Sequence, residues 1–392
     1  MSMKNPELTK YCYLKSRFTG FFAFLLLSAC QPQSPDQAEL MQQARHEPAA
    51  AMQLAAERLA RGEYDAALDW FRQGASLGDI AALEHALQLQ QRQQGKLATA
   101  AWLQQQINSG TIAPGAVRPE KRAELGLWLD NNPVVTGYQS TAGCTLSLQP
   151  VATQQAGVNT WQQLLQHWQQ DPQLAGLPVC FLPLHRVSSV ALACSEDSSA
   201  LVQCDYPVLD ELVAQGSFSQ LLVIAGRGKA SYNNGILQLP DNADIALLRH
   251  EFMHIFGFID EYALAPATAE EVCQPGKIHP NLVLATDVEA YIQHWNLAKT
   301  PVLTAVDTCR AINIQAYRVI AEDNVMRFYE LPLPDRYFQL IQLILRQPEQ
   351  LMPVQYYYAY LARQRQDWQK WQQFMQQASM HGYADATQAL AP

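Results

Sequence analysis

The chain has 392 residues, of which 48% are hydrophobic and 16% are charged, a composition typical of globular proteins with well-formed cores. Its formal net charge at pH 7 is −9, which excludes nucleic acid as an expected partner and argues against electrostatic binding to an anionic bilayer. No Walker A or Gly-x-Gly-x-x-Gly sequence occurs, so NTPases and dinucleotide enzymes lack support.

Residues 1–30 are predicted to be a lipoprotein signal peptide. Four basic residues precede an apolar run at 18–27, which is too short to span a bilayer as a permanent helix. The run ends in Leu-Ser-Ala-Cys, which resembles the bacterial lipobox. The resemblance implies cleavage before Cys30 and attachment of lipid to this residue, which would hold the protein at a membrane of the cell envelope. Gln31 follows in place of an aspartate, which favours the outer membrane; an ordinary signal peptide with a chance cysteine is the alternative.

Residues 31–36 are predicted to be a short polar tether. Beyond Cys30 the chain contains six cysteines: Cys144, Cys180, Cys194, Cys204, Cys273 and Cys309. An even number in an exported chain predicts up to three disulfides, for which fifteen pairings are possible. No Cys-x-x-Cys pair occurs, so a zinc site built from cysteines is not expected.

Residues 37–126 are predicted to form a helical-repeat-like domain, because apolar residues recur at helical spacing and residues 49–108 contain no proline. The segment 59–79 resembles one Sel1-like or tetratricopeptide-type hairpin, and the C-terminal helical region, residues 336–392, echoes it. Such repeats need about three copies to bury a continuous core. We therefore expect these flanks to support the middle of the chain; a surface that docks a protein partner is the alternative.

Residues 127–335 differ in composition from both flanks and are predicted to be a separate domain. Short apolar runs at 220–225 and 235–239 predict buried strands. Residues 240–244 can start a helix, and the helix expected after them is apolar on almost every side, as in the centre of a domain. The predicted fold class is α+β, with a mixed sheet in the middle domain and all-α hairpins at both ends.

His250 and His254 interrupt this apolar helix four residues apart, so both imidazoles project from one face and can bind one metal ion. Glu251 lies at the neighbouring position, where its carboxylate can take a proton from a metal-bound water without ligating the metal. Three residues beyond His254, Gly257 can adopt a positive φ and end the helix. The chain can then turn back and bring Asp260 to the ion as a third ligand.

The run His-Glu-Phe-Met-His-Ile-Phe-Gly-Phe-Ile-Asp-Glu-Tyr at 250–262 resembles the HExxHxxGxx(H/D) signature of metzincin zinc peptidases. Its aspartate followed by Glu-Tyr resembles the bacterial immunoglobulin A peptidase family and, more loosely, snapalysin. The resemblance implies an α/β/α catalytic domain over residues 127–335, a Zn²⁺ cofactor and the hydrolysis of extracytoplasmic protein or peptide substrates, with Glu251 as general base. It also implies a methionine turn beneath the zinc, for which Met326 is the candidate, and an edge strand at 235–239 that pairs with an extended substrate.

Several roles have alternatives. Glu261 and Tyr262 orient the ligands, or they form a surface ion pair and a packed ring. Tyr329 is a candidate donor to the oxyanion of the reaction. Glu289, on a later predicted helix, is an alternative third ligand, as in thermolysin-type enzymes. The non-enzymatic alternative is a lipid-anchored interaction scaffold with a non-catalytic zinc site. The zinc motif alone does not specify a substrate.

Overall fold

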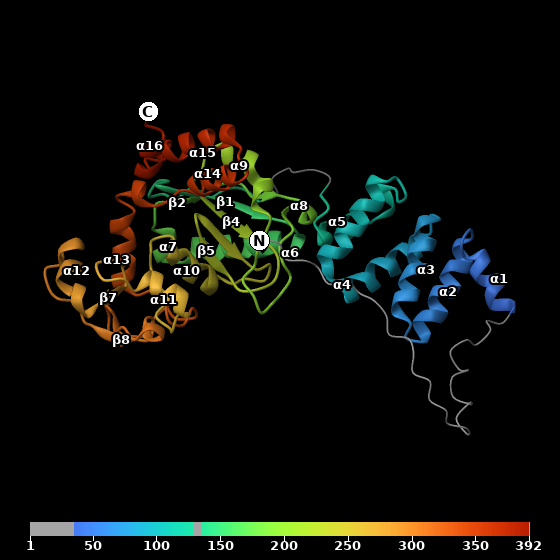
Figure 1. The fold of residues 1–392 in the computed structure, drawn as a ribbon, viewed down its shortest axis with the longest axis horizontal. Coiled ribbons are helices and arrows are strands. Elements are labelled where there is room, and N and C mark those ends of the chain that lie inside the picture. Colours follow the sequence, from blue (N-terminus) through green and yellow to red (C-terminus); the bar gives the residue numbers. More distant parts are fainter. Residues whose placement is uncertain (1–34, 129–134, 392) are drawn as a thin grey trace, which may run out of the picture. The chain divides into compact units, whose positions relative to one another are not determined.

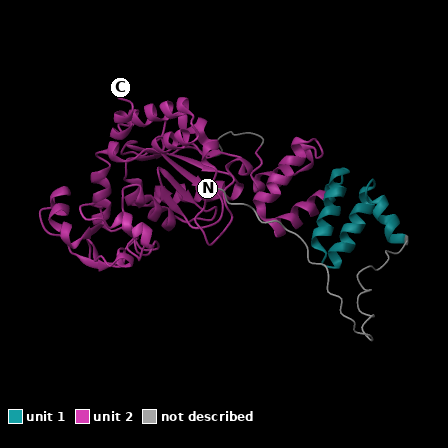
Figure 2. Ribbon diagram, in the orientation of Figure 1, with its two compact units in different colours: residues 1–82 teal, residues 83–392 magenta. Residues whose placement is uncertain are grey.

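The computed structural model describes residues 35–128 and 135–391 (Figure 1). The predicted signal peptide with Cys30 and most of the predicted tether therefore lie outside the described residues. Helix α1 (Pro35–Gln43) begins inside the last two residues assigned to the tether. In the described ranges, no helix combines the length and apolar character needed to cross a bilayer. The chain divides into two compact units, Met1–Ala82 and Leu83–Pro392 (Figure 2).

The first unit is helical, as the sequence predicts. It contains α1, α2 (Pro48–Ala60), α3 (Tyr64–Ser76) and the first turn of α4 (Ile80–Asn108). The turn between α2 and α3 contains Gly62 at a φ of +74°, a left-handed conformation that glycine adopts without strain. Small and apolar side chains, among them Ala51 and Leu54 of α2, form a buried cluster against α1. This packing orders the short helices.

The second unit begins within α4, which is divided by a kink at Gly95 (φ 86°, ψ 174°). The carboxylate of Glu196 accepts a hydrogen bond from the backbone N–H of Lys96 at 3.0 Å and so satisfies the start of the second helical segment. A 3-10 turn, Pro114–Ala116, and α5 (Pro119–Leu125) follow. Glu196 thus ties this part of the helical flank to the middle of the chain.

The main sheet of the second unit has the strand order β2-β1-β4-β6-β5, with β3 pairing with β1 beside β2. The strands are β1 (Leu146–Ala152), β2 (Val179–Phe181), β3 (His185–Arg186), β4 (Gln220–Ile224), β5 (Ser231–Asn233) and β6 (Ile236–Leu239). All pairs are parallel except β5 with β6, which makes the sheet mixed, as predicted. The buried strands predicted at 220–225 and 235–239 are confirmed as β4 and β6.

One strand prediction is wrong. The resemblance to metzincins predicts an edge strand at 235–239, but β6 lies between β4 and β5, and the strand at that end of the described sheet is β5. The reason lies in the turn at 234–235. Asn234 and Gly235 both have positive φ values (53° and 81°), which matches the two-residue hairpin that folds β5 back onto β6.

Helices cover both faces of this sheet. Leu222 and Ile224 of β4 point into a core shared with α6 (Gln155–Gln170) and α10 (Ile245–His254). The alternate residues, Leu221 and Val223, point into a second core shared with α14 (Val354–Gln364) and α15 (Trp368–Met380). Figure 1 shows α14 and α15 on one side of β1 and β4, and α10 on the other. The fold is thus of the α+β class, with its sheet buried between helices.

Shorter elements connect these layers. They are α7 (Pro172–Ala175), α8 (Ser189–Leu192), the 3-10 helix Tyr206–Leu209 and α9 (Asp210–Ala214). Toward the C-terminus the chain forms α13 (Asp335–Ile344), the 3-10 helix Pro348–Gln350, α14, α15 and α16 (Ala384–Ala389). A Cβ added at Gly235 would lie 2.6 Å from the Cα of Val354, so the start of α14 sits directly on the β5–β6 turn. Residues 336–391 therefore pack within the same unit as the middle domain.

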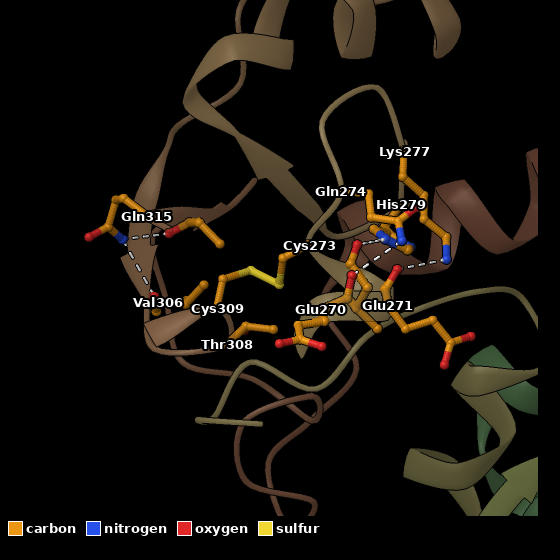
Figure 3. The surroundings of a disulfide bond; sticks show 12 residues. Glu270, Glu271, Cys273, Gln274, Lys277, His279, Val306, Thr308, Cys309 and Gln315 are labelled. Atoms are coloured by element: carbon orange, nitrogen blue, oxygen red, sulfur yellow. Dashed lines mark hydrogen bonds between the residues drawn. A yellow bond between two sulfur atoms is a disulfide. The ribbon is translucent and has the colours of Figure 1, made fainter. Parts of the chain in front are cut away.

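A small disulfide-linked subdomain, residues 264–320, is inserted after α10. It contains α11 (Pro266–Val272), β7 (Leu282–Leu284), the 3-10 helix Ala285–Asp287, α12 (Val288–His294), β8 (Thr304–Val306), the 3-10 helix Arg310–Ile312 and β9 (Ala316–Arg318). Its strands form an antiparallel sheet with the order β7-β9-β8. Its own apolar cluster includes Cys273 and Cys309, which are joined by a disulfide (Figure 3).

The six cysteines beyond Cys30 form three disulfides, which confirms the predicted number and selects one of the fifteen pairings. The bonds are Cys144–Cys180, Cys194–Cys204 and Cys273–Cys309. The first and third close loops of the same sequence separation, 36 residues, in different parts of the second unit. Because the two loops have the same length, removal of the first disulfide is a control for removal of the third.

Candidate metal centre

Helix α10 carries the first part of the site. Asp244 caps its N-terminus, because its carboxylate accepts a hydrogen bond from the backbone N–H of Leu247 at 2.8 Å. This confirms the helix start predicted at 240–244. Phe252 and Met253 are fully buried in the core shared with the sheet. The packing of this apolar helix fixes the faces from which His250, Glu251 and His254 project.

The glycine bend after α10 brings the third residue back. Gly257 has a φ of +78°, as the sequence predicts, and the helix ends at His254. The chain then reverses so closely that Nδ1 of His254 bonds the backbone carbonyl of Phe258 at 2.8 Å. Two residues later, Asp260 faces both imidazoles.

The three predicted ligands converge. Oδ1 of Asp260 lies 3.2 Å from Nε2 of His250 and 3.5 Å from Nε2 of His254. Within residues 35–128 and 135–391, this trio is the one group of three or more His, Cys, Asp or Glu side chains whose ligand atoms gather closely enough to hold a metal ion, all within 4.8 Å of one another. The group is largely buried and can bind a metal ion.

The hydrogen bonds of the two imidazoles suit a cation. Nδ1 of His250 bonds the backbone carbonyl of Val325 at 2.8 Å, and Nδ1 of His254 bonds that of Phe258. A carbonyl only accepts, so we assign the ring proton to Nδ1 in both residues, and each neutral ring presents the lone pair of Nε2 to Asp260. Oδ1 of Asp260 is buried and has no hydrogen-bond partner among the described residues. Three lone pairs that face one another need a cation or protons between them.

When no cation is bound, a proton on His254 can meet this need. Burial disfavours the charged form of His254, but the facing carboxylate of Asp260 outweighs burial and raises the pKa of His254 to about 9. For Asp260, burial alone would raise the pKa, but the two imidazoles lower it well below its usual range. Metal ligands must lose such protons, so a metal ion competes with them for the same lone pairs.

Tyr262 binds the other oxygen of Asp260, the third predicted ligand. Its hydroxyl donates to Oδ2 of Asp260 at 2.7 Å, while 47% of the residue is exposed to solvent. Partial burial of the ring and the negative charge of Asp260 raise the pKa of Tyr262 above its usual value, which favours the protonated hydroxyl. With Oδ2 occupied, Oδ1 is the oxygen left free to ligate. Of the two roles that the sequence leaves open for Tyr262, the structure has the ligand-orienting contact.

Glu251 is buried beside the ligands. Burial raises the pKa of its carboxyl, and the charges of His254 and His250 oppose this shift. A carboxyl whose affinity for protons is raised in this way is better suited than an exposed one to accepting a proton and returning it.

The turn that carries Met326 lies beneath the site. Met326 is completely buried in the core shared with α10. The carbonyl of Val325, one residue earlier, is the partner of His250, and the carbonyl of Met326 accepts from the backbone N–H of Glu261 at 2.9 Å. The turn is therefore bonded to His250 on one side and to Glu261, the residue after Asp260, on the other. Tyr329, by contrast, is exposed, and the charged groups that raise its pKa are Glu330 and Asp244 at the far end of α10.

Glu289 does not join the ligands. It is exposed on α12, where its carboxylate accepts a hydrogen bond from Gln293 at 3.1 Å, and it lies outside the convergent group. The alternative in which Glu289 is the third ligand is therefore dropped. His279, in the same subdomain, is buried, and its Nε2 bonds the carbonyl of Val272 at 3.0 Å (Figure 3).

Glu261 is an interior residue, not half of a surface ion pair. Its carboxylate contacts Asn281, Arg318, Asn324 and Tyr337, none of which was identified from the sequence. Asn324 could have been suspected because it precedes Met326 by two residues. The other three lie in the subdomain or in α13, and no local pattern marks them.

Comparison with known proteins adds no relative: no family model matches the chain, and no similar sequence was found among curated proteins.

Proposed function

We propose that the protein is a zinc-dependent endopeptidase that hydrolyses peptide bonds of extracytoplasmic proteins. The observation that carries the proposal is the convergence of His250, His254 and Asp260, with Glu251 buried next to them. Two imidazole nitrogens and one carboxylate oxygen form a donor set that suits Zn²⁺. Three protein ligands leave a fourth position for water or substrate, which is the arrangement of catalytic zinc sites.

Each side chain has a task in this reaction. Zinc, when bound, supplies a Lewis acid that polarises the scissile carbonyl and makes water more acidic. Glu251 accepts a proton from the attacking water and returns it to the amine that leaves. The Nδ1 hydrogen bonds of His250 and His254 fix their tautomers, and Tyr262 fixes the carboxylate of Asp260.

The resemblance of residues 250–262 to metzincins supports this function, as does a buried methionine turn bonded to the ligand set. We also propose that Glu251 and the ligands act on an extended peptide laid along β5, the strand that ends the described sheet. On the sequence of its first thirty residues, we propose attachment to the outer membrane through lipid on Cys30. The helical flanks then support the catalytic unit at the membrane or bind a partner.

The test combines metal analysis with digestion of casein and a peptide library. We expect one zinc per chain and cleavage that a chelator abolishes and added zinc restores. Glu251→Gln should keep the zinc and lose cleavage, because the amide cannot accept the proton. If the protein binds zinc but cleaves nothing under any condition, the interaction scaffold becomes the better description.

A further inference from the structure

Glu261 is a fully buried carboxylate with partners from separate segments of the chain. It is 1% exposed. Its Oε1 accepts hydrogen bonds from Tyr337 of α13 at 2.6 Å and from Asn281, just before β7, at 3.0 Å. Its Oε2 accepts from Asn324 at 2.8 Å and lies 3.8 Å from Nη1 of Arg318 in β9. A buried carboxylate is costly unless it is paired in this way, and losing one partner leaves the others unsatisfied.

Two residues of the subdomain, Asn281 and Thr308, hold the backbone at Ile259 and Asp260. Asn281 also bonds both backbone groups of Ile259, accepting from its N–H at 2.9 Å and donating to its carbonyl at 2.7 Å. The hydroxyl of Thr308 donates to the carbonyl of Asp260 itself at 2.8 Å. The peptide that carries the third ligand is therefore fixed by the subdomain at residues 259 and 260.

The same network reaches the methionine turn. Asn324 donates its amide to Glu261 and accepts with Oδ1 from the backbone N–H of Met326 at 2.9 Å. The backbone N–H of Glu261 donates to the carbonyl of Met326. Val325, between these two residues, is the partner of His250. Glu261 is thus bonded to the turn that binds His250 in two ways: its side chain accepts from Asn324, and its backbone N–H donates to Met326.

We propose that Glu261 is a positioning residue that sets the place of Asp260 relative to the two imidazoles. The subdomain of residues 264–320 acts on the metal site through Glu261 and through its own bonds to the backbone at residues 259 and 260. The inference rests on the proposed metal site. It gives the subdomain a role in metal binding, since Asn281, Thr308 and Arg318 all belong to it. Glu261 itself lies outside the convergent group of His250, His254 and Asp260.

The test compares two buried, paired carboxylates. Glu261→Gln keeps the shape of the side chain but turns one acceptor into a donor that faces the donors of Asn324 and Arg318. Asp210→Asn is the matched control: Asp210 is 5% exposed and pairs with Arg365 and Lys370, but it lies in α9, which packs in the core on the opposite face of the sheet from α10. Zinc affinity is measured by competition with a chromophoric chelator, and the geometry of the site by the visible absorption of bound Co²⁺.

We expect Glu261→Gln to lower zinc affinity about tenfold or more, which is the effect found for groups that orient metal ligands, and to change the Co²⁺ spectrum. Asp210→Asn should lose stability while keeping affinity and spectrum. If Glu261→Gln does not fold, Tyr337→Phe serves instead, because it removes one hydrogen bond but keeps the ring against Phe258. It should give a smaller loss of affinity in the same direction.

The outcomes separate this inference from the proposed function. Wild-type protein that binds no metal overturns both. Wild-type affinity and spectrum in Glu261→Gln, or an equal change in Asp210→Asn, overturns the positioning role alone. Normal metal binding without peptidase activity removes the proposed enzyme and leaves the role of Glu261 standing.

Discussion

Nδ1 of His250 and the backbone carbonyl of Val325 are 2.8 Å apart, so the first ligand of the proposed metal site rests on the turn that contains Met326. The turn is bound on its other side by the backbone N–H of Glu261, which follows the third ligand, Asp260. One turn is thus bonded both to His250 and to the residue that follows Asp260. Packing beneath this turn should therefore matter for both stability and metal binding.

Substitutions of Met326 test how much the packing of this turn contributes to stability. We expect Met326→Ala to lower the free energy of unfolding by about 2–5 kcal/mol, because a fully buried side chain leaves a cavity. Met326→Leu nearly conserves the volume and should cost less than about 1.5 kcal/mol. Urea unfolding followed by fluorescence measures both. Met380→Ala, at a residue that is 70% exposed, is the control and should change stability by no more than about 0.5 kcal/mol. Equal effects of the two alanine variants would contradict the packing role.

Asp260→Ala should nearly abolish zinc binding. This change removes one of three protein ligands and leaves two buried imidazoles without their facing carboxylate. We expect zinc affinity to fall at least about 100-fold, which is more than the loss expected when a residue that only orients a ligand is changed. Equilibrium dialysis with zinc measures it. Glu289→Ala is the control and should bind like the wild type, since Glu289 is exposed on α12. The reverse result would restore the thermolysin-type ligand set.

The sequence predicts the placement of His250, His254 and Asp260 well, because it depends only on residues that are close to one another in the chain. Helical spacing places His250 beside His254, and a glycine that allows positive φ lets Asp260 return to them. Strands β4 and β6 were found because buried apolar runs between turn residues are a strong signal. The edge of the sheet was misplaced because strand order depends on which hairpin forms, and the Asn-Gly turn at 234–235 adds one more strand, β5.

The support of the site could not be predicted in the same way. Tyr337, Asn281 and Arg318 reach Glu261 from 76, 20 and 57 residues away, and only the tertiary fold brings them together. A tyrosine near the start of an amphipathic helix has the same local pattern whether its hydroxyl meets solvent or a buried carboxylate. The disulfide pairing is a similar case, since six cysteines by themselves favour none of the fifteen arrangements.

His279 should make stability depend on pH. Burial lowers the pKa of this histidine, and Lys277 adds to the effect. The folded state therefore binds a proton on His279 less readily than the unfolded chain, which takes one up below about pH 6.5. Stability consequently falls as the pH falls through this value. The slope from this one group is at most about 1.4 kcal/mol per pH unit.

The measurement is urea unfolding of the wild type and His279→Gln between pH 7.5 and 5. Glutamine can donate to the carbonyl of Val272, as Nε2 does in the wild type, but it does not titrate. We expect the stability difference between the two proteins to change with pH in favour of the variant on the acid side. A difference that stays constant across this range would show that His279 keeps the same protonation in both states.

The Cys273–Cys309 disulfide should stabilise both the subdomain and the metal site. It closes a loop of 36 residues, for which loop entropy predicts about 3–4 kcal/mol of stabilisation. Thr308 lies next to Cys309 (Figure 3). Its hydroxyl donates to the carbonyl of Asp260. Changing both cysteines to serine should therefore lower stability and also weaken zinc binding, because the segment that holds the third ligand becomes more mobile.

The matched control removes Cys144–Cys180, which has the same sequence separation and no contact with the ligands. A similar stability loss with unchanged zinc affinity is expected there, so weaker zinc binding in both double variants would mean that metal affinity follows global stability and not the hold on Asp260.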